Sequence, residues 1–173
     1  MNKQNKLSEN DIDQALITRL NQSGTLIHFK TRPLILAHFP VEIAVKFLNR
    51  GEEEQFESHI SILHKGQVGR DLFLICEGKI SVWKDNVLLA ELHKGDVFGE
   101  LVLYRDHYRI ANVQAEEPTR VLKFSRHIIM DHFARLDPKY LTIYNMNVIE
   151  ILRRKLIATN ARVVQLEKQL LNK

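Results

Sequence analysis

Gly95-Asp96-Val97-Phe98-Gly99-Glu100 is the stretch that decides the fold, and Arg109 follows nine residues after Glu100. Gly99 allows a sharp turn and lets a ligand come close to the backbone. A short helix from Glu100 would point free N–H groups at that ligand, and Arg109 would offer two phosphate oxygens a planar charged fork. A carboxylate beside a phosphate is repulsive unless hydroxyls donate to it. The stretch therefore indicates a ligand that joins a phosphate to a hydroxylated sugar.

On either side of this stretch, residues 56–126 consist of short apolar runs separated by turn residues. Runs rich in Val, Ile and Phe are typical of strands. The runs lie at residues 60–63, 72–75, 80–83, 87–92 and 121–124, with residues 84–86 as a hairpin tip and Trp83 packed on the sheet. Closely spaced strands with glycine between them predict a small antiparallel sandwich or jelly roll.

The string Phe98-Gly99-Glu100, followed after eight residues by Arg109-Ile110-Ala111-Asn112, resembles the phosphate-binding cassette of the cyclic nucleotide-binding domain family. Residues 66–80 also resemble the family's paired strands, and the resemblance covers residues 56–126. It implies that Glu100 holds a ribose 2′-hydroxyl and Arg109 a cyclic phosphate, with backbone N–H groups near Gly99 and Ala111 assisting. The ligand-binding residues that it implies are Phe98, Gly99, Glu100, Leu101, Arg109, Ile110, Ala111 and Asn112, and the implied ligand is cAMP or cGMP.

Two positions depart from the family's pattern. Val102 stands where the family usually has a small residue, and Asn112 replaces the small or hydroxyl residue that lies beside the phosphate in many relatives. Because an Asn side chain both donates and accepts hydrogen bonds, it leaves the preference for adenine or guanine open. An alternative is that Glu100 and Arg109 form an ion pair in a relative that has lost its ligand, which would leave an interaction or dimerisation scaffold.

Helical patterns flank the strands on both sides. A helix is expected from Ser8 to a stop at Gly24, and a shorter one over residues 40–48. After the strands, helices are expected over residues 127–136 and from Pro138 to about Leu171. The expected fold is therefore mainly β with flanking helices. Its parts are an N-terminal helical segment (1–50), a β-sandwich (51–136) and a long C-terminal helix (137–173).

The last helix carries an apolar seam with heptad spacing. Its members are Ile149, Leu152, Leu156, Thr159, Val163, Leu166 and Leu170. Such a seam predicts a two-stranded coiled coil, because at 1.5 Å per residue a helix of this length extends beyond what one small sandwich covers. A homodimer is therefore expected.

The polar part of this seam has two interpretations. In the catabolite-activator branch of the family, a Thr-Ser pair on the dimer helix reaches the adenine. Alignment on the basic residues 153–155 places Thr159 and Asn160 there as base contacts, whereas alignment on Pro138 shifts the match by three residues. The other interpretation is that Thr159 sets the register of the coiled coil.

Composition excludes several classes of protein. With 45% hydrophobic and 27% charged residues, the chain can form a core, and its net charge of +4 comes from basic residues spread among acids. The polar first ten residues and the absence of a long apolar run predict a cytoplasmic protein. Cys76, the only cysteine, excludes an internal disulfide and a Cys-based metal site.

Catalysis is not expected either. The eight histidines include no His-x-His pair, and the sequence has no Ser–His–Asp arrangement that could be defended, so neither an enzyme nor a metal or cofactor is predicted. Gene regulators of this architecture continue past the dimer helix into a winged helix-turn-helix, whereas this sequence ends at Lys173. The expected function is a non-enzymatic cyclic nucleotide sensor that signals through its dimer helix to an unknown effector protein. The alternatives are the scaffold and a truncated DNA-binding regulator.

Overall fold

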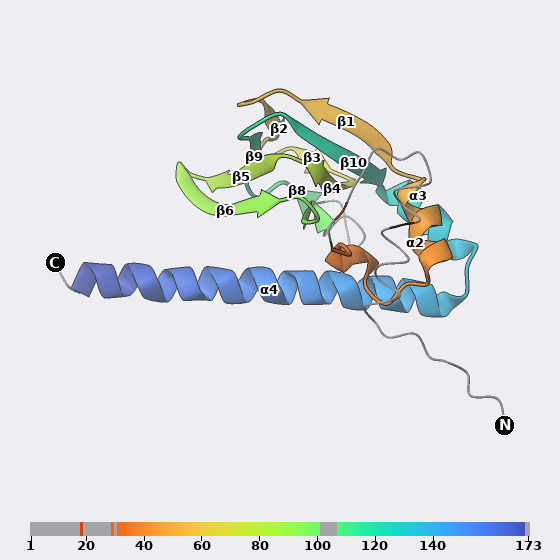
Figure 1. Cartoon of the computed structure of the whole chain (residues 1–173). Coiled ribbons are helices and arrows are strands. Elements are labelled where there is room, and N and C mark those ends of the chain that lie inside the picture. Colours follow the sequence, from red (N-terminus) through yellow and green to blue (C-terminus); the bar gives the residue numbers. More distant parts are fainter. Residues whose placement is uncertain (1–17, 19–28, 30, 101–106, 172–173) are drawn as a thin grey trace.

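A computed structural model describes residues 18, 29, 31–100 and 107–171 of the chain. It has two antiparallel sheets face to face, with helices beside one of them and a long helix running beneath (Figure 1). The expected fold, mainly β with flanking helices, is confirmed. The helix expected between Ser8 and Gly24 lies outside the described residues, apart from Thr18.

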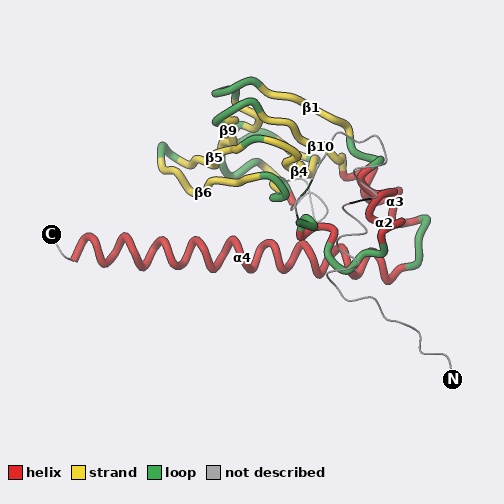
Figure 2. Tube along the Cα trace, in the orientation of Figure 1, coloured by secondary structure: helices red, strands yellow, loops and turns green. Residues whose placement is uncertain are grey.

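Figure 2 distinguishes the strands from the helices, which precede and follow them along the chain. The strands are β1 (Glu52–Phe56), β2 (Ser61–Leu63), β3 (Val68–Gly69), β4 (Asp71–Glu77), β5 (Lys79–Lys84), β6 (Val87–His93), β7 (Val97–Phe98), β8 (His107–Tyr108), β9 (Asn112–Ala115) and β10 (Thr119–Ser125). The helices are the 3₁₀ turn η1 (Leu34–Leu36), α2 (Val41–Leu48), α3 (Arg126–Ala134) and α4 (Pro138–Leu171).

Among the described residues, the strands form two four-stranded sheets and one small pair. The first sheet has the order β1-β10-β4-β7 and the second has the order β2-β9-β5-β6, while β3 pairs with β8. Every apolar run that the sequence pattern indicated overlaps a strand. The hairpin tip is also confirmed, because β5 and β6 are joined by Asp85 and Asn86, whose φ angles of 50° and 65° are those of a tight hairpin turn.

Strand β4 lies between the two halves of the core. Leu72 and Leu74 point toward α2, α3 and α4, whereas Phe73 and Ile75 point into the space between the sheets. Successive side chains of a strand face opposite sides, so a strand covered on both faces is apolar without interruption. This explains why residues 72–76 form a continuous apolar run rather than an alternating one.

Cys76 lies on the helix side of β4 and is fully buried. Burial raises the pKa of its thiol to about 12. Its Sγ–H donates to the carbonyl of Leu74 at 3.5 Å. The thiol therefore stays protonated and unreactive at neutral pH.

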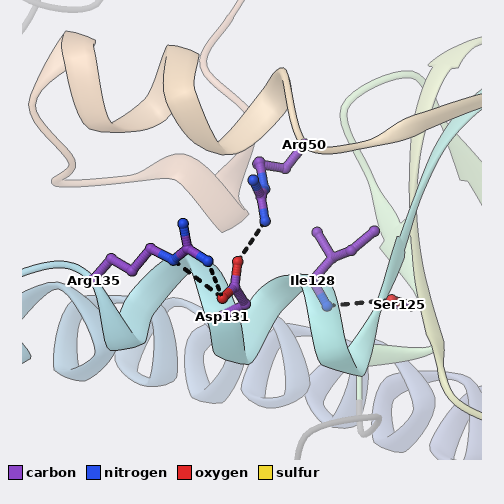
Figure 3. A network of polar contacts seen from close by, with 5 residues as sticks. All are labelled: Arg50, Ser125, Ile128, Asp131 and Arg135. Atoms are coloured by element: carbon purple, nitrogen blue, oxygen red, sulfur yellow. Dashed lines mark hydrogen bonds and ion pairs between the residues drawn. The ribbon is translucent and has the colours of Figure 1, made fainter.

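A polar network attaches α3 to its neighbours (Figure 3). Ser125 precedes the helix and its hydroxyl accepts a hydrogen bond from the N–H of Ile128 at 3.3 Å, which satisfies one of the free donors of the first turn. Asp131 pairs with Arg135 one turn later at 2.8 Å and with Arg50, just before β1, at 2.6 Å. The helix is thus fixed at its start and along its exposed side.

The first half of α4 packs on the helical core, and the second half does not. Tyr144, Val148 and Ile151 are buried there, and the amide of Asn147 donates to the carbonyls of Ile35 and Ala37 at 3.1 and 2.7 Å. From residue 156 to 171 every position is exposed. This second half passes beside β6, where Arg162 donates to the carbonyl of Leu89 at 3.3 Å (Figure 1).

Candidate functional site

The guanidinium of Arg109 lies in a slot whose walls are two glycines. A Cβ at Gly69 would overlap the guanidinium, and one at Gly99 would lie 2.8 Å from Nη1 of Arg109 and overlap the carbonyl of Asp71. Gly99 also has a φ of +75°, which L side chains rarely adopt. The position of the guanidinium therefore depends on glycine at both sites, which together hold the arginine next to the turn that follows β7.

The charge of Arg109 is only partly satisfied by the protein. Its Nη2 donates to the carbonyl of Asp71 at 3.0 Å, whereas Nε is buried and has no hydrogen-bond partner among the described residues. Burial lowers the pKa of the guanidinium, and the carboxylates of Asp71 and Glu100 raise it. A buried cation with an unused N–H group favours an anion as its partner.

Two stacked aromatic rings form the floor beneath this arginine. Phe73 of β4 and Phe98 of β7 stack with centroids 4.8 Å apart and planes inclined by 7°. The carbon Cζ of Arg109 lies 5.9 Å from the centroid of Phe73, within the range of a cation–π contact. Since both rings belong to the core between the sheets, the guanidinium rests on a rigid surface.

Glu100 is buried, with only 8% of its surface exposed, and its partner comes from α4. The ammonium of Lys155 lies 3.1 Å from each carboxylate oxygen of Glu100 and donates to the carbonyl of Val97 at 2.9 Å. The alternative from the sequence, an ion pair between Glu100 and Arg109, is therefore not the pairing in this structure. The carboxylate is held by a helix residue 55 positions further along the chain.

The remaining residues of the predicted cassette occupy different surroundings. Leu101, Val102 and the rest of the short helix expected from Glu100 lie outside the described residues. Ile110 is 72% exposed and Ala111 is buried. The side chain of Asn112 accepts from the N–H of Lys65 at 2.8 Å and lines an open hollow on the outer face of the second sheet, with Trp83 and Gln114. Asn112 thus points away from the core between the sheets, which Val113 enters.

Residues 53–135 match the family model of the cyclic nucleotide-binding domain. This segment belongs to the cyclic nucleotide-binding domain family. Human cGMP-dependent protein kinase 2 is 30% identical over 89 residues, which cover 48% of this chain and 12% of the kinase. The chain thus matches only a small part of that relative.

Solved structures agree on the fold. The catabolite activator protein of Thermus thermophilus, at 26% identity, superposes with a TM-score of 0.62 over 81% of this chain and 63% of its own. A cyclic nucleotide-binding domain from Methylobacillus flagellatus, at 19% identity, has a TM-score of 0.70 over 88% of this chain and 82% of its own. The second likeness extends over most of both chains and concerns the fold alone.

Glu100 is bonded on α4 to Lys155 and not to the predicted base contacts. Thr159 is exposed, and its hydroxyl donates to the carbonyl of Lys155 in its own helix at 2.9 Å. Asn160 is exposed as well. Their role toward a nucleobase stays a prediction.

Four residues of the site were not predicted from the sequence: Gly69, Asp71, Phe73 and Lys155. The first three belong to residues 66–80, which resemble the family's paired strands. That likeness indicated strands there, but it did not indicate the role of any one side chain. Lys155 ends the basic stretch 153–155, of which Arg153 and Arg154 instead pair with Glu150 at 2.6 and 2.8 Å. Nothing in that pattern distinguishes the one lysine that turns inward.

Neither a metal site nor a membrane span is found in the described part of the chain. No group of three His, Cys, Asp or Glu side chains lies together there as metal ligands. None of the described helices has the length and apolar character needed to cross a membrane.

Proposed function

We propose that the chain is a non-enzymatic sensor of a cyclic nucleotide, cAMP or cGMP. Arg109 binds the cyclic phosphate and Glu100 accepts hydrogen bonds from the ribose 2′-hydroxyl. The observation that carries the proposal is the slot between Gly69 and Gly99, where the buried Nε of Arg109 lacks a hydrogen-bond partner among the described residues. The family match and the likeness to a cGMP-dependent kinase support the same ligand class.

Calorimetric titration tests this proposal. The wild-type chain should release or take up heat with cAMP or cGMP at submillimolar concentration, and much less with the non-cyclic 5′-monophosphates. Arg109→Ala should weaken binding at least ~100-fold, since hydrogen bonds to charged groups contribute about 1.5–3 kcal/mol each and two are lost. Arg135→Ala is the matched control, because this exposed arginine follows α3 and, among the described residues, pairs with the carboxylate of Asp131. Equal affinity in the wild type and Arg109→Ala would place the ligand elsewhere.

We further propose that the second half of α4 forms a homodimer and carries the signal to an effector protein. The seam residues Leu156, Val163, Leu166 and Leu170 are exposed to between 47% and 73%. A row of exposed apolar side chains at heptad spacing is what a two-stranded coiled coil buries. Ligand would then bias one of two arrangements of the dimer.

The scaffold alternative has one observation in its favour. Glu100 already has an ionic partner in Lys155, so the carboxylate is satisfied by the protein itself. A dimer that shows no heat with either cyclic nucleotide would select the scaffold over the sensor.

A further inference from the structure

Lys155 uses its whole hydrogen-bonding capacity on the segment that carries Glu100. An ammonium group has three N–H donors. Three acceptors lie within reach of its Nζ, namely the two oxygens of Glu100 at 3.1 Å and the carbonyl of Val97 at 2.9 Å. The side chain of Glu100 is 10% exposed and that of Lys155 34% exposed, so the pair is largely shielded from water.

The position of Lys155 on α4 makes this contact important for the helix. Ile151, one turn earlier, is the last buried residue of α4, and every position from 156 to 171 is exposed. Beyond Lys155, Arg162 donates to the carbonyl of Leu89 at 3.3 Å in an exposed setting. The pair with Glu100 is therefore the charged contact that fastens the middle of α4 to the turn after β7.

We propose that Lys155 is an internal competitor for the carboxylate of Glu100, so that a ligand hydroxyl taking this carboxylate releases α4 from the sandwich. The inference rests on the proposed function, because it assigns the regulation of the same site. The ammonium of Lys155 contacts both oxygens of this shielded carboxylate, so a ligand hydroxyl that donates to it has to displace at least one of these hydrogen bonds. Ligand binding and the attachment of α4 then oppose one another, and thermodynamic linkage makes the opposition reciprocal.

Replacement of Lys155 by methionine, an apolar side chain of similar length, tests the competition through the affinity for cyclic nucleotides. Lys155→Met removes the ammonium that donates to the carboxylate of Glu100, and a ligand hydroxyl then binds there without displacing Lys155. We expect Lys155→Met to bind cAMP or cGMP at least fivefold more tightly than the wild type. Arg154→Met is the matched control: it removes the same charge from the adjacent position, yet Arg154 pairs with Glu150 and not with Glu100.

A nucleotide that lacks the 2′-hydroxyl distinguishes competition for Glu100 from a general effect of removing the positive charge of Lys155. For 2′-deoxy-cAMP, Lys155→Met and the wild type should have equal affinities within twofold, because no hydroxyl contests Glu100. Equal or weaker binding of both cAMP and cGMP by Lys155→Met, or the same gain for 2′-deoxy-cAMP, overturns the proposal.

Hydrogen exchange of the full chain tests the contact without any nucleotide. Amides of residues 152–162 should exchange several-fold faster in Lys155→Met and in Glu100→Gln than in the wild type or Arg154→Met, and the double variant should exchange no faster than either single one. Unchanged exchange in both single variants overturns the role of the pair in holding α4. If no variant binds a cyclic nucleotide, the sensor function and the competition both fail, whereas loss of binding in Arg109→Ala with no gain in Lys155→Met overturns the competition alone.

Discussion

Gly69 and Arg109 show how a missing side chain can fix the position of a charged one. The guanidinium occupies the space that a Cβ at position 69 would take, and one of its N–H groups holds the carbonyl of Asp71. The orientation of the arginine therefore depends on a residue that contributes no side chain of its own.

Gly69→Ala should weaken cyclic nucleotide binding at least ~10-fold with little change in folding, because the new methyl displaces the guanidinium while the backbone there needs no positive φ. Calorimetric titration and thermal melting measure the two effects. Gly66→Ala is the control: a Cβ there meets nothing within 4 Å, but the φ of +89° makes the substitution cost about 1–2 kcal/mol of stability. Equal affinity in Gly69→Ala and Gly66→Ala would contradict this account of the slot.

His132 of α3 predicts an acid-sensitive stability. Its side chain is buried against Phe47 and Phe133, and its Nε2 has no hydrogen-bond partner among the described residues. Burial lowers the pKa of the imidazole below its usual 6.5, the cations of Arg50 and Lys46 lower it further, and Asp131 raises it.

Because the unfolded chain binds a proton more readily at this position, the contribution of His132 to stability is complete above pH 6.5 and is lost as the pH falls from 6.5 through the folded-state pKa. The melting temperature should therefore fall less between pH 7.5 and pH 5.5 in His132→Phe than in the wild type. His127→Gln, at an exposed position of the same helix, should keep the wild-type slope. Parallel slopes in all three proteins would exclude His132 as the source.

Among the residues of the candidate site, the sequence pattern indicated those that lie close together in the chain. It missed those that only the folded structure brings together. Glu100 and Arg109 are separated by nine positions, and the cassette spacing pointed to both. Lys155 reaches Glu100 only because α4 packs its first half on the helical core and passes close to β7. A contact of this kind is set by packing between distant segments, which a pattern within one segment does not contain.

Among the elements, α3 has a side-chain cap at its start. The hydroxyl of Ser125 satisfies the N–H of Ile128, and Asp131 connects the helix to Arg50 and Arg135 (Figure 3). The Asp131 contacts are on the surface, where ion pairs contribute little. The Ser125 cap should therefore contribute more to the stability of the fold than the ion pairs of Asp131.

Ser125→Ala should lower the free energy of unfolding by about 1 kcal/mol, since the first turn of α3 loses its side-chain acceptor. Urea denaturation measures the change. Thr142→Ala provides the comparison, because that exposed hydroxyl donates only to the carbonyl of Pro138 in its own helix, and its removal should change stability by less than about 0.5 kcal/mol. A Ser125→Ala chain as stable as Thr142→Ala would show that the cap is replaced by water.

The elements that the sequence predicted are those with a clear apolar pattern. The long apolar runs over residues 72–75, 80–83, 87–92 and 121–124 lie on strands, and α4 covers the predicted range. Strands β3, β7 and β8 have two residues each, too few to show a period, and β1 and β9 contain no continuous apolar run, so the sequence pattern did not reveal them. Two of these short strands also carry the slot, since Gly69 ends β3 and Gly99 follows β7.

At the scale of the whole molecule, the second half of α4 should decide the oligomeric state. Val163 and Val164 are exposed to nearly the same extent, 48% and 49%, but only Val163 belongs to the heptad seam. Val163→Glu should convert the proposed dimer into a monomer at micromolar concentration, because two carboxylates would meet in the coiled-coil interface. Val164→Glu should remain a dimer.

Light scattering after size-exclusion chromatography measures both masses. A wild-type monomer, or a Val163→Glu chain that remains a dimer, would remove the coiled coil from the proposed mechanism. Equal dissociation of both variants would point to an interface wider than the seam.

The buried thiol of Cys76 has a practical consequence for observing these events. With a pKa of about 12 and no exposed surface, it should not react with maleimides at neutral pH. Since it is the only cysteine of the chain, one introduced at an exposed position of α4, such as Glu167→Cys, would carry a fluorophore at a single known place. The natural sequence is already a background for fluorescence measurements of helix motion, without prior removal of a native thiol.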